Sequence, residues 1–177
     1  MKKTVYILFL ILLSSKGLAQ QNNAVNIKSI SNNFNKLQVS AYQNSSLEKF
    51  DQFVEYFNLM QKTDDLDLKN QLKESIFILF QSTETEFSDF LSNNEKIKLN
   101  QFISKYQNSK DILEVISQES NKSVLQNSWV NSYQIKINSG KTIALEQLIS
   151  FQIQEKKFGK NSKEVWEIKL GNLSIKQ

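Results

Sequence analysis

The last third of the chain alternates apolar and polar side chains in a way that few folds can accommodate. Apolar residues of one parity recur in three runs: Trp129, Tyr133, Ile135 and Ile137; Ile149, Phe151 and Ile153; and Trp166, Ile168 and Leu170. Because successive side chains of a strand point to opposite faces, each run predicts a strand with one apolar face and one wet face. The earlier segments must then supply the cover for the apolar face.

Three segments before this sheet have apolar residues at helical spacing. The first predicted helix opens at Ser46, carries a wide aromatic stripe and ends at Met60. The second covers Leu66–Phe80, and the third pattern runs from Ile97 to Tyr106. Such stripes are far more often core than the lining of a ligand cavity. The fold class that follows is α+β, with N-terminal helices packed on a curled antiparallel sheet formed mainly by the C-terminal half.

The remaining segments are interpreted as short strands and turns. Residues 83–91 predict a short strand with a turn, and residues 111–119 fit a strand or a helix, with Val and Ile favouring the strand. Residues 138–141 predict a hairpin turn in which Gly140 takes a positive φ. Residues 156–163 predict a second connection, and Gly171-Asn172 a turn or bulge before a short final strand.

Residues 1–19 have the pattern of a cleaved signal peptide. Lys2 and Lys3 form a positive start, Val5–Leu13 is an apolar run, and Gly17-Leu18-Ala19 supplies small residues at the cleavage site. A membrane-spanning helix would need about 20 apolar residues, which this run does not reach. We therefore expect an exported protein, periplasmic or extracellular, with no membrane span in the mature chain.

The rest of the chain is long enough for one domain. Residues 20–45 are rich in Asn, Ser and Gln and are interpreted as a flexible leader, and residues 46–177 as a single α+β domain.

Charge argues against a nucleic-acid partner. The chain has 22 Lys, no Arg and 18 acidic residues, and loss of residues 1–19 leaves 19 Lys and a net charge of +1. The lysines are scattered, and arginine, the side chain that binds phosphate and guanine through two hydrogen bonds, is absent.

The absence of His and Cys restricts the chemistry further. Without these side chains there is no imidazole base, no usual nucleophilic triad, no disulfide and no thiolate metal site. We expect no cofactor and no metal. Asp64, Asp65 and Asp67 form the densest acidic cluster, but the spacing lacks the Gly and the distal Glu of a calcium loop. A helix N-terminus explains this cluster better, because it attracts carboxylates.

Five segments set out the order of the elements: Leu47–Met60 as the long first helix, Trp129–Ile137 as a central strand, Phe151–Ile153, Lys157–Lys160 and Lys163–Ile168. This order resembles the nuclear-transport-factor-2-like (cystatin-like cone) superfamily, and the closing segment in particular is similar to members of its secreted, uncharacterised bacterial branch. The resemblance implies a sheet curled around a helix, often with a pocket. Enzymes of that superfamily use Asp, His or Tyr in the pocket, whereas this chain has no His and no Asp that maps onto such a position.

The function expected from these observations is a non-enzymatic, exported binding or interaction module with an apolar pocket for a small ligand. Five large side chains are the candidate ligand contacts: Phe53, Phe57, Trp129, Tyr133 and Trp166. A protein partner, or a homodimer through the exposed face of the sheet, is an open alternative.

The alternative from another class is a small hydrolase or isomerase that depends on carboxylates. Glu84 and Glu86 share one strand parity and form the clearest pair. Such pairs usually lie on a solvated face, and acid–base catalysis needs burial to shift the pKa of the acid.

Overall fold

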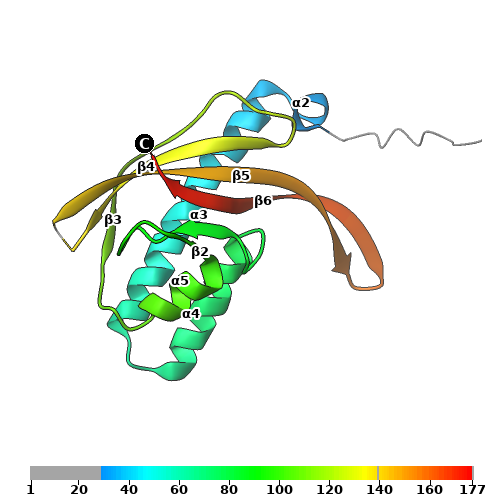
Figure 1. Cartoon of the computed structure of the whole chain (residues 1–177). Coiled ribbons are helices and arrows are strands. Elements are labelled where there is room, and N and C mark those ends of the chain that lie inside the picture. Colours follow the sequence, from blue (N-terminus) through cyan, green and yellow to red (C-terminus); the bar gives the residue numbers. More distant parts are fainter. Residues whose placement is uncertain (1–28, 139, 177) are drawn as a thin grey trace, which may run out of the picture.

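The computed structural model describes residues 29–138 and 140–176 of the chain. Its helices are α2 (Ile30–Asn33), α3 (Lys36–Lys62), α4 (Leu66–Leu79) and α5 (Leu99–Tyr106). Its strands are β1 (Glu86–Ser88), β2 (Lys96–Lys98), β3 (Leu113–Ser120), β4 (Ser128–Ile137), β5 (Lys141–Phe158) and β6 (Asn161–Ile175). The helices pack against one sheet formed mainly by the C-terminal strands, so the α+β class is confirmed (Figure 1). The predicted signal peptide and residues 20–28 of the predicted leader lie outside the described residues.

The long helix α3 begins ten residues earlier than the sequence analysis placed it. Asn35 is its N-cap: the Asn35 side chain accepts from Gln38 N (2.9 Å), and Gln38 Oε1 accepts from Asn35 N (3.0 Å). This reciprocal pair satisfies two backbone donors and starts the helix. Ser46, predicted to open the helix, lies inside it, and its hydroxyl donates to Gln43 O (2.6 Å).

The acidic cluster at residues 64–67 starts α4, as the capping interpretation predicts. The Asp65 carboxylate accepts from the backbone N–H groups of Asp67 (2.8 Å) and Leu68 (3.1 Å). These are donors that a helix N-terminus leaves without an intrahelical partner. The cluster is therefore explained by helix initiation.

The six strands form one open sheet in the order β2-β1-β6-β5-β4-β3. All neighbouring pairs are antiparallel except β1 and β6, which run parallel, so the sheet is mixed rather than purely antiparallel. The strands expected within residues 83–91 and 111–119 are confirmed as β1 and β3. Ile97, assigned from its spacing to the third helix, lies in β2, and α5 starts only at Leu99.

The two hairpin turns differ from the prediction. In the β4–β5 turn Asn138 takes the positive φ (49°), whereas Gly140 does not. The second connection is much tighter than residues 156–163: β5 continues to Phe158 and β6 starts at Asn161. Gly159 takes the positive φ (64°) in this turn, which a side chain would disfavour.

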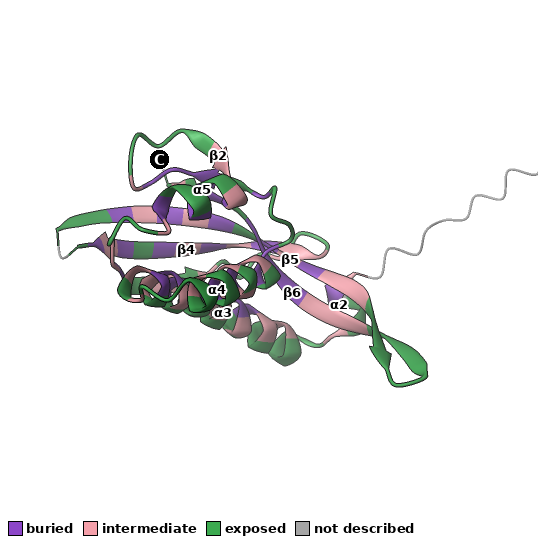
Figure 2. Ribbon diagram, turned by 90° about the horizontal axis from the view of Figure 1, so that it is seen from below, coloured by how far each residue is buried: buried purple, intermediate pink, exposed green. Residues whose placement is uncertain are grey.

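The predicted alternation places the core between α3 and the sheet. Trp129, Tyr133 and Ile135 of β4 are buried, while the residues between them are half-buried or exposed, except Asn131 on the buried parity (Figure 2). The ring of Phe50 in α3 stacks on that of Tyr133 at 3.6 Å between centroids. The buried face of the sheet is therefore the face that α3 covers.

A bulge at Gly171 keeps β6 in register with its neighbours. Gln147 pairs with Leu173 and Ile149 with Leu170, so three steps along β6 match two along β5. The extra residue lies at Gly171-Asn172, where the sequence predicted a turn or bulge. A Cβ added to Gly171 would lie 2.7 Å from Leu148 O, so the two backbones meet where only glycine fits.

Replacing Gly171 by Ala should lower the free energy of unfolding by about 2 kcal/mol, because the added methyl group overlaps a backbone oxygen that cannot move alone. The matched control is Gly140→Ala, where the nearest atom to the new Cβ is 3.8 Å away and no positive φ is required. That variant should keep or slightly gain stability. Urea unfolding of both proteins checks the prediction, and equal stabilities would contradict it.

Candidate binding site

The five aromatic residues predicted to line a pocket fall into two connected groups. Phe53 and Phe57 are fully buried in α3, and their rings lie 6.2 Å apart. Phe50 joins them to Tyr133, stacking on that ring and lying 5.7 Å from Phe53. Phe53, Phe57 and Tyr133 therefore belong to one series of ring contacts that starts at β4 and continues along α3. Phe53 also packs on Phe80 and Phe87, and Phe57 on Phe102.

The other two predicted residues, Trp129 and Trp166, meet through Phe151. Trp166 stacks on Phe151 at 4.7 Å with an angle of 11° between the rings, and Trp129 lies 6.3 Å from the same ring. Trp166 is half-buried, whereas Trp129 is 2% exposed. The part of these residues in ligand binding stays a prediction.

A chain of buried polar side chains crosses the core beside these aromatic groups. Asn131 Nδ2 donates to Ser46 Oγ (2.8 Å) and to Tyr133 OH (3.0 Å), and Tyr133 OH donates to Gln147 Oε1 (3.0 Å). Trp129 Nε1 also donates to Ser46 Oγ (3.2 Å). Buried polar groups are stable only when hydrogen-bonded, and this chain satisfies nearly all of them.

Backbone carbonyls at both ends set the direction of every hydrogen bond in the chain. Gln147 Nε2 donates to Gly171 O (3.3 Å), and Ser46 Oγ donates to Gln43 O (2.6 Å). A carbonyl oxygen can only accept, so the group that faces it must donate. Gln147 therefore turns its Nε2 group to Gly171 O and its Oε1 atom to Tyr133, and Ser46 Oγ, whose hydrogen is used, can only accept from Asn131 and Trp129. Both hydrogens of Asn131 Nδ2 are then in use, and Asn131 Oδ1 is left buried without a partner in the described residues.

Burial also decides what the Tyr133 phenol can do chemically. Burial raises the pKa of Tyr133 well above its usual value, the Asp51 carboxylate adds to the rise, and the hydrogen bond from Asn131 opposes it. The phenol therefore stays protonated at any physiological pH and cannot serve as a general base.

Asp89 is a deeply buried carboxylate that the sequence analysis did not single out. Its side chain is 1% exposed and pairs with Lys105 (Nζ to Oδ2, 2.6 Å), while Tyr106 OH donates to Oδ1 (2.5 Å). Its backbone N–H donates to Glu95 O (2.7 Å), which fixes the β1–β2 loop. Both oxygens are satisfied by the chain itself, which is the environment of a structural acid. A lone acid between Phe87 and Phe90 was the signal for it.

The carboxylate pair named for the enzymatic alternative lies at the surface. Glu84 accepts from Asn100 Nδ2 (2.8 Å), and Glu86 lies 3.9 Å from Lys96 Nζ. Both acids are exposed. Their position offers none of the burial that would prepare a carboxylate for acid–base catalysis.

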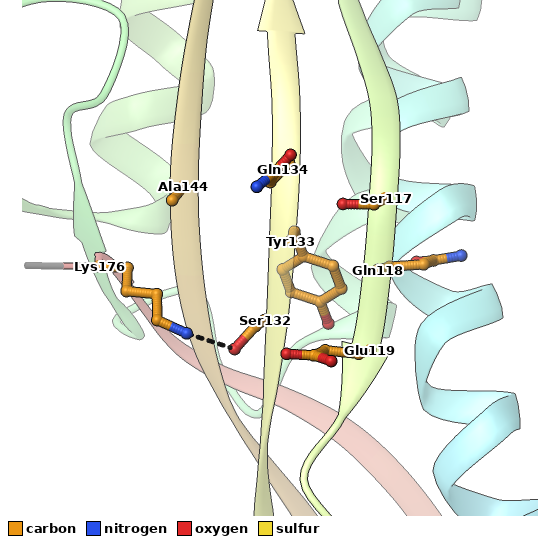
Figure 3. Close-up of a pocket in the computed structure, with 8 residues that line it drawn as sticks. All are labelled: Ser117, Gln118, Glu119, Ser132, Tyr133, Gln134, Ala144 and Lys176. Carbon is orange, nitrogen blue, oxygen red and sulfur yellow. Dashed lines mark hydrogen bonds between the residues drawn. The ribbon is translucent and has the colours of Figure 1, made fainter.

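Two polar hollows lie on the face of the sheet opposite to α3. The first holds about 170 Å³ and is lined by Ser117, Gln118, Glu119, Ser132, Tyr133, Gln134, Ala144 and Lys176 (Figure 3). Lys176 Nζ pairs with Glu146 (3.2 Å) and approaches Ser132 Oγ (3.4 Å), so its charge is already met. An adjoining hollow of about 360 Å³ carries charges of both signs and one apolar side chain, Val130. Ligand pockets are mostly apolar and usually exceed ~300 Å³, which neither hollow combines.

An apolar groove between α2, the start of α3 and the β3–β4 loop meets both conditions. It holds about 520 Å³ and is lined by Ile30, Phe34, Lys36, Val39, Ser40, Gln43, Lys122 and Val124. The α2–α3 groove, as we call this set of eight residues, has a hydrogen bond across its base from Ile30 N to Asn127 Oδ1 (2.7 Å). Another bond, from Gln43 Nε2 to Asn121 O (2.8 Å), ties the helix to the opposite wall.

The floor of this groove continues into the aromatic group that contains Trp166. Phe34 packs edge-on against Tyr42 (5.2 Å), Phe151 (5.6 Å) and Trp166 (5.6 Å). One of the five predicted ligand contacts is thus a direct neighbour of the groove. Phe34 and Val39 themselves lay in the segment interpreted as a flexible leader, so sequence reasoning missed the wall of the site.

Lysines supply the charge of the α2–α3 groove. Lys36 and Lys122 line it, and its eight lining residues include no acid. The groove therefore presents an apolar surface with a positive rim, a combination suited to a molecule with an apolar body and an anionic end.

In the part of the chain that the structure describes, no three acidic, His or Cys side chains gather to hold a metal ion. Within the same residues, no helix is both long and apolar enough to cross a membrane. No protein-family model matches the chain, and no curated protein or solved structure matches it.

Replacing Tyr133 by Phe should lower the free energy of unfolding by about 1–3 kcal/mol at pH 7, because Gln147 Oε1 loses its donor inside the core. The unfolded phenol ionises near pH 10, whereas burial keeps the folded phenol protonated. The stability that this difference contributes is complete below about pH 10 and is lost as the pH rises further. The free energy of unfolding of the variant should therefore fall less steeply above that pH.

Urea unfolding at neutral and alkaline pH measures both effects. Tyr42→Phe is the control at pH 7, because the Tyr42 hydroxyl has no hydrogen-bond partner in the described residues and its ring packs on Phe151 as before. Equal losses in the two variants would contradict the role assigned to the buried chain.

Proposed function

We propose that the protein is an exported, non-enzymatic module that binds a small amphiphilic molecule in the α2–α3 groove. The observation that carries the proposal is the lining of the groove, which combines apolar side chains with Lys36 and Lys122 and no acid. An apolar body gains free energy by leaving water for such a surface, at about 25 cal/mol per Å² of area buried. An anionic end then faces the two ammonium groups at the rim.

The polar groups at the groove support orientation rather than reaction. Ser40 and Gln43 are uncharged, and neither is paired with a base that could activate it. Asp89, the buried carboxylate, does not line the groove and is held by Lys105 and Tyr106. This arrangement favours binding over catalysis.

The fold of the chain also supports the proposed relation to the nuclear-transport-factor-2-like superfamily. A long helix covers the buried face of a sheet built mainly from the second half of the chain, as that resemblance implies. The sheet is open, however, and the groove lies at one end of α3 rather than within a closed cone. Membership stays a proposal.

Decanoate, compared with uncharged decanol, is the probe that tests the function. We expect decanoate to bind at one site per chain and to bind several-fold more tightly than decanol, because exposed ion pairs add up to about 1 kcal/mol. Replacing Lys36 and Lys122 by Gln should weaken binding of decanoate several-fold and leave that of decanol unchanged. Isothermal titration calorimetry measures both affinities.

A groove-filling variant and its neighbour locate the site. Ser40→Phe places a ring in the groove and should weaken both probes at least tenfold, whereas Ala41→Phe, at an exposed position that does not line the groove, should leave both affinities unchanged. Equal binding by the two variants, or no binding of decanoate by the unchanged chain, would overturn the proposal.

A further inference from the structure

The β5–β6 hairpin extends beyond the rest of the sheet as a two-stranded arm. β4 accompanies β5 only as far as Ser150, whereas β5 and β6 stay paired until Phe158 meets Asn161. In Figure 1 this arm leaves the body of the fold at the right and bends downward, with its tip apart from the helices. All residues from 155 to 164 are exposed.

The tip of the arm carries a charge opposite to that of the rest of the described chain. Residues 156–163 contain four lysines and no acid, a charge of +4 in eight residues. Residues 29–177 as a whole contain 18 Lys and 18 acidic residues, so everything in that range outside the tip sums to −4. Two of the acids outside the tip, Glu155 and Glu164, flank it directly, so residues 155–164 carry +2 and the rest of residues 29–177 carries −2. The charge is therefore unevenly distributed, with its positive end at the tip.

The register of the strands sorts these charges by face. Lys156 pairs with Lys163, and Phe158 with Asn161, so both lysines and the phenylalanine lie on one face of the arm. Glu155 pairs with Glu164 on the opposite face, which also holds Lys157. One face is thus basic and aromatic, and the acids next to the tip lie on the other.

Two features of this face are unfavourable for the isolated protein. Like charges directly opposite each other destabilise a strand pair, and a two-stranded ribbon is only marginally stable in water. Glu167 lies 3.5 Å from Lys156 Nζ and from Lys169 Nζ, but no ion pair joins Lys160 or Lys163 to a described residue. Phe158 is 55% exposed beside them. An external surface that is both anionic and apolar would neutralise the opposed lysines and cover the Phe158 ring.

We propose that the tip of the β5–β6 arm is a docking site for an anionic lipid surface. Phe158 enters the headgroup region, and Lys156, Lys160 and Lys163 contact lipid phosphates, each lysine contributing to the attraction of the tip. Outside residues 155–164, the rest of residues 29–177 carries a charge of −2, which the same surface repels, so the molecule approaches with the arm leading.

The geometry favours a membrane over a soluble polyanion. A projecting tip reaches a flat surface without hindrance from the body, whereas single-stranded nucleic acids are bound along extended basic grooves. Arginine, which stacks and forks onto such polymers, is absent from the chain. An aromatic ring at the very end of a hairpin suits insertion into a lipid interface.

Co-sedimentation with vesicles tests the proposal on the protein purified after expression of the full chain. We expect binding to vesicles of phosphatidylcholine mixed with phosphatidylglycerol, little binding to phosphatidylcholine alone, and a steep loss of binding as salt shortens the range of the attraction. Vesicles without anionic lipid also report any apolar binding by other segments. Equal binding to both vesicle types would overturn the proposal.

Matched variants place the interaction on the tip. Replacing Lys160 and Lys163 by Gln should weaken binding by about fivefold per lysine. Replacing Lys110 and Lys141 by Gln removes the same charge from exposed positions at the far end of the sheet and should change binding little. Phe158→Ser should weaken binding several-fold without altering its salt dependence.

Two results would overturn the assignment. One is an equal loss of binding in the two lysine pairs, which would show an effect of net charge alone. The other is tight, tip-dependent binding of soluble heparin together with no binding to anionic vesicles, which would assign the arm to an acidic polymer. Because none of these variants changes a residue of the α2–α3 groove, failure here leaves the decanoate experiment unaffected.

Discussion

The contact between the middle of α3 and the centre of β4 holds the fold together. Phe50 stacks on Tyr133 while Ser46, one turn earlier in the helix, accepts from Trp129 and Asn131 of the same strand. Apolar area supplies most of the free energy of this contact, but apolar area alone would allow the helix to slide. The hydrogen bonds to Ser46 form at only one position of α3 along β4, so they fix where the helix packs on the strand.

The polar chain beyond this contact extends the same constraint to β5 and β6. Each member is fixed in its donor or acceptor role by a backbone carbonyl, so a shift of β5 by one residue would remove Gln147 from Tyr133 and also from Gly171 O. The chain therefore specifies strand register from within the core, at the point where the Gly171 bulge has already adjusted it. Its one unsatisfied atom, Asn131 Oδ1, requires a buried donor such as water.

Sequence reasoning succeeded where one signal dominated the local structure. The alternation in 129–137 reports burial on one face, and Asp65 reports a helix start, because in both cases neighbouring residues determine the outcome. It failed at the start of α3, where residues 36–45 are polar and the helix begins through a side-chain exchange between Asn35 and Gln38. The α2–α3 groove was lost with that segment, since two of its walls meet only through tertiary contacts.

The extension of β5 and β6 into the arm was also missed, because its residues lack an apolar pattern. Exposed lysines and a Gly-Lys pair resemble a loop in sequence, because no apolar face marks residues 155–164 as a strand. What extends the pairing is its base, where Phe34 and Tyr42 cover Phe151 and Trp166. Beyond Val165 that aromatic cover ends, and the pairing continues by backbone hydrogen bonds, with the ion pair between Lys156 and Glu167 joining the two strands. Because the ribbon is anchored at its base, the residues at its tip need not contribute to the core and can serve contact with an external surface. The opposed lysines Lys156 and Lys163 are such residues.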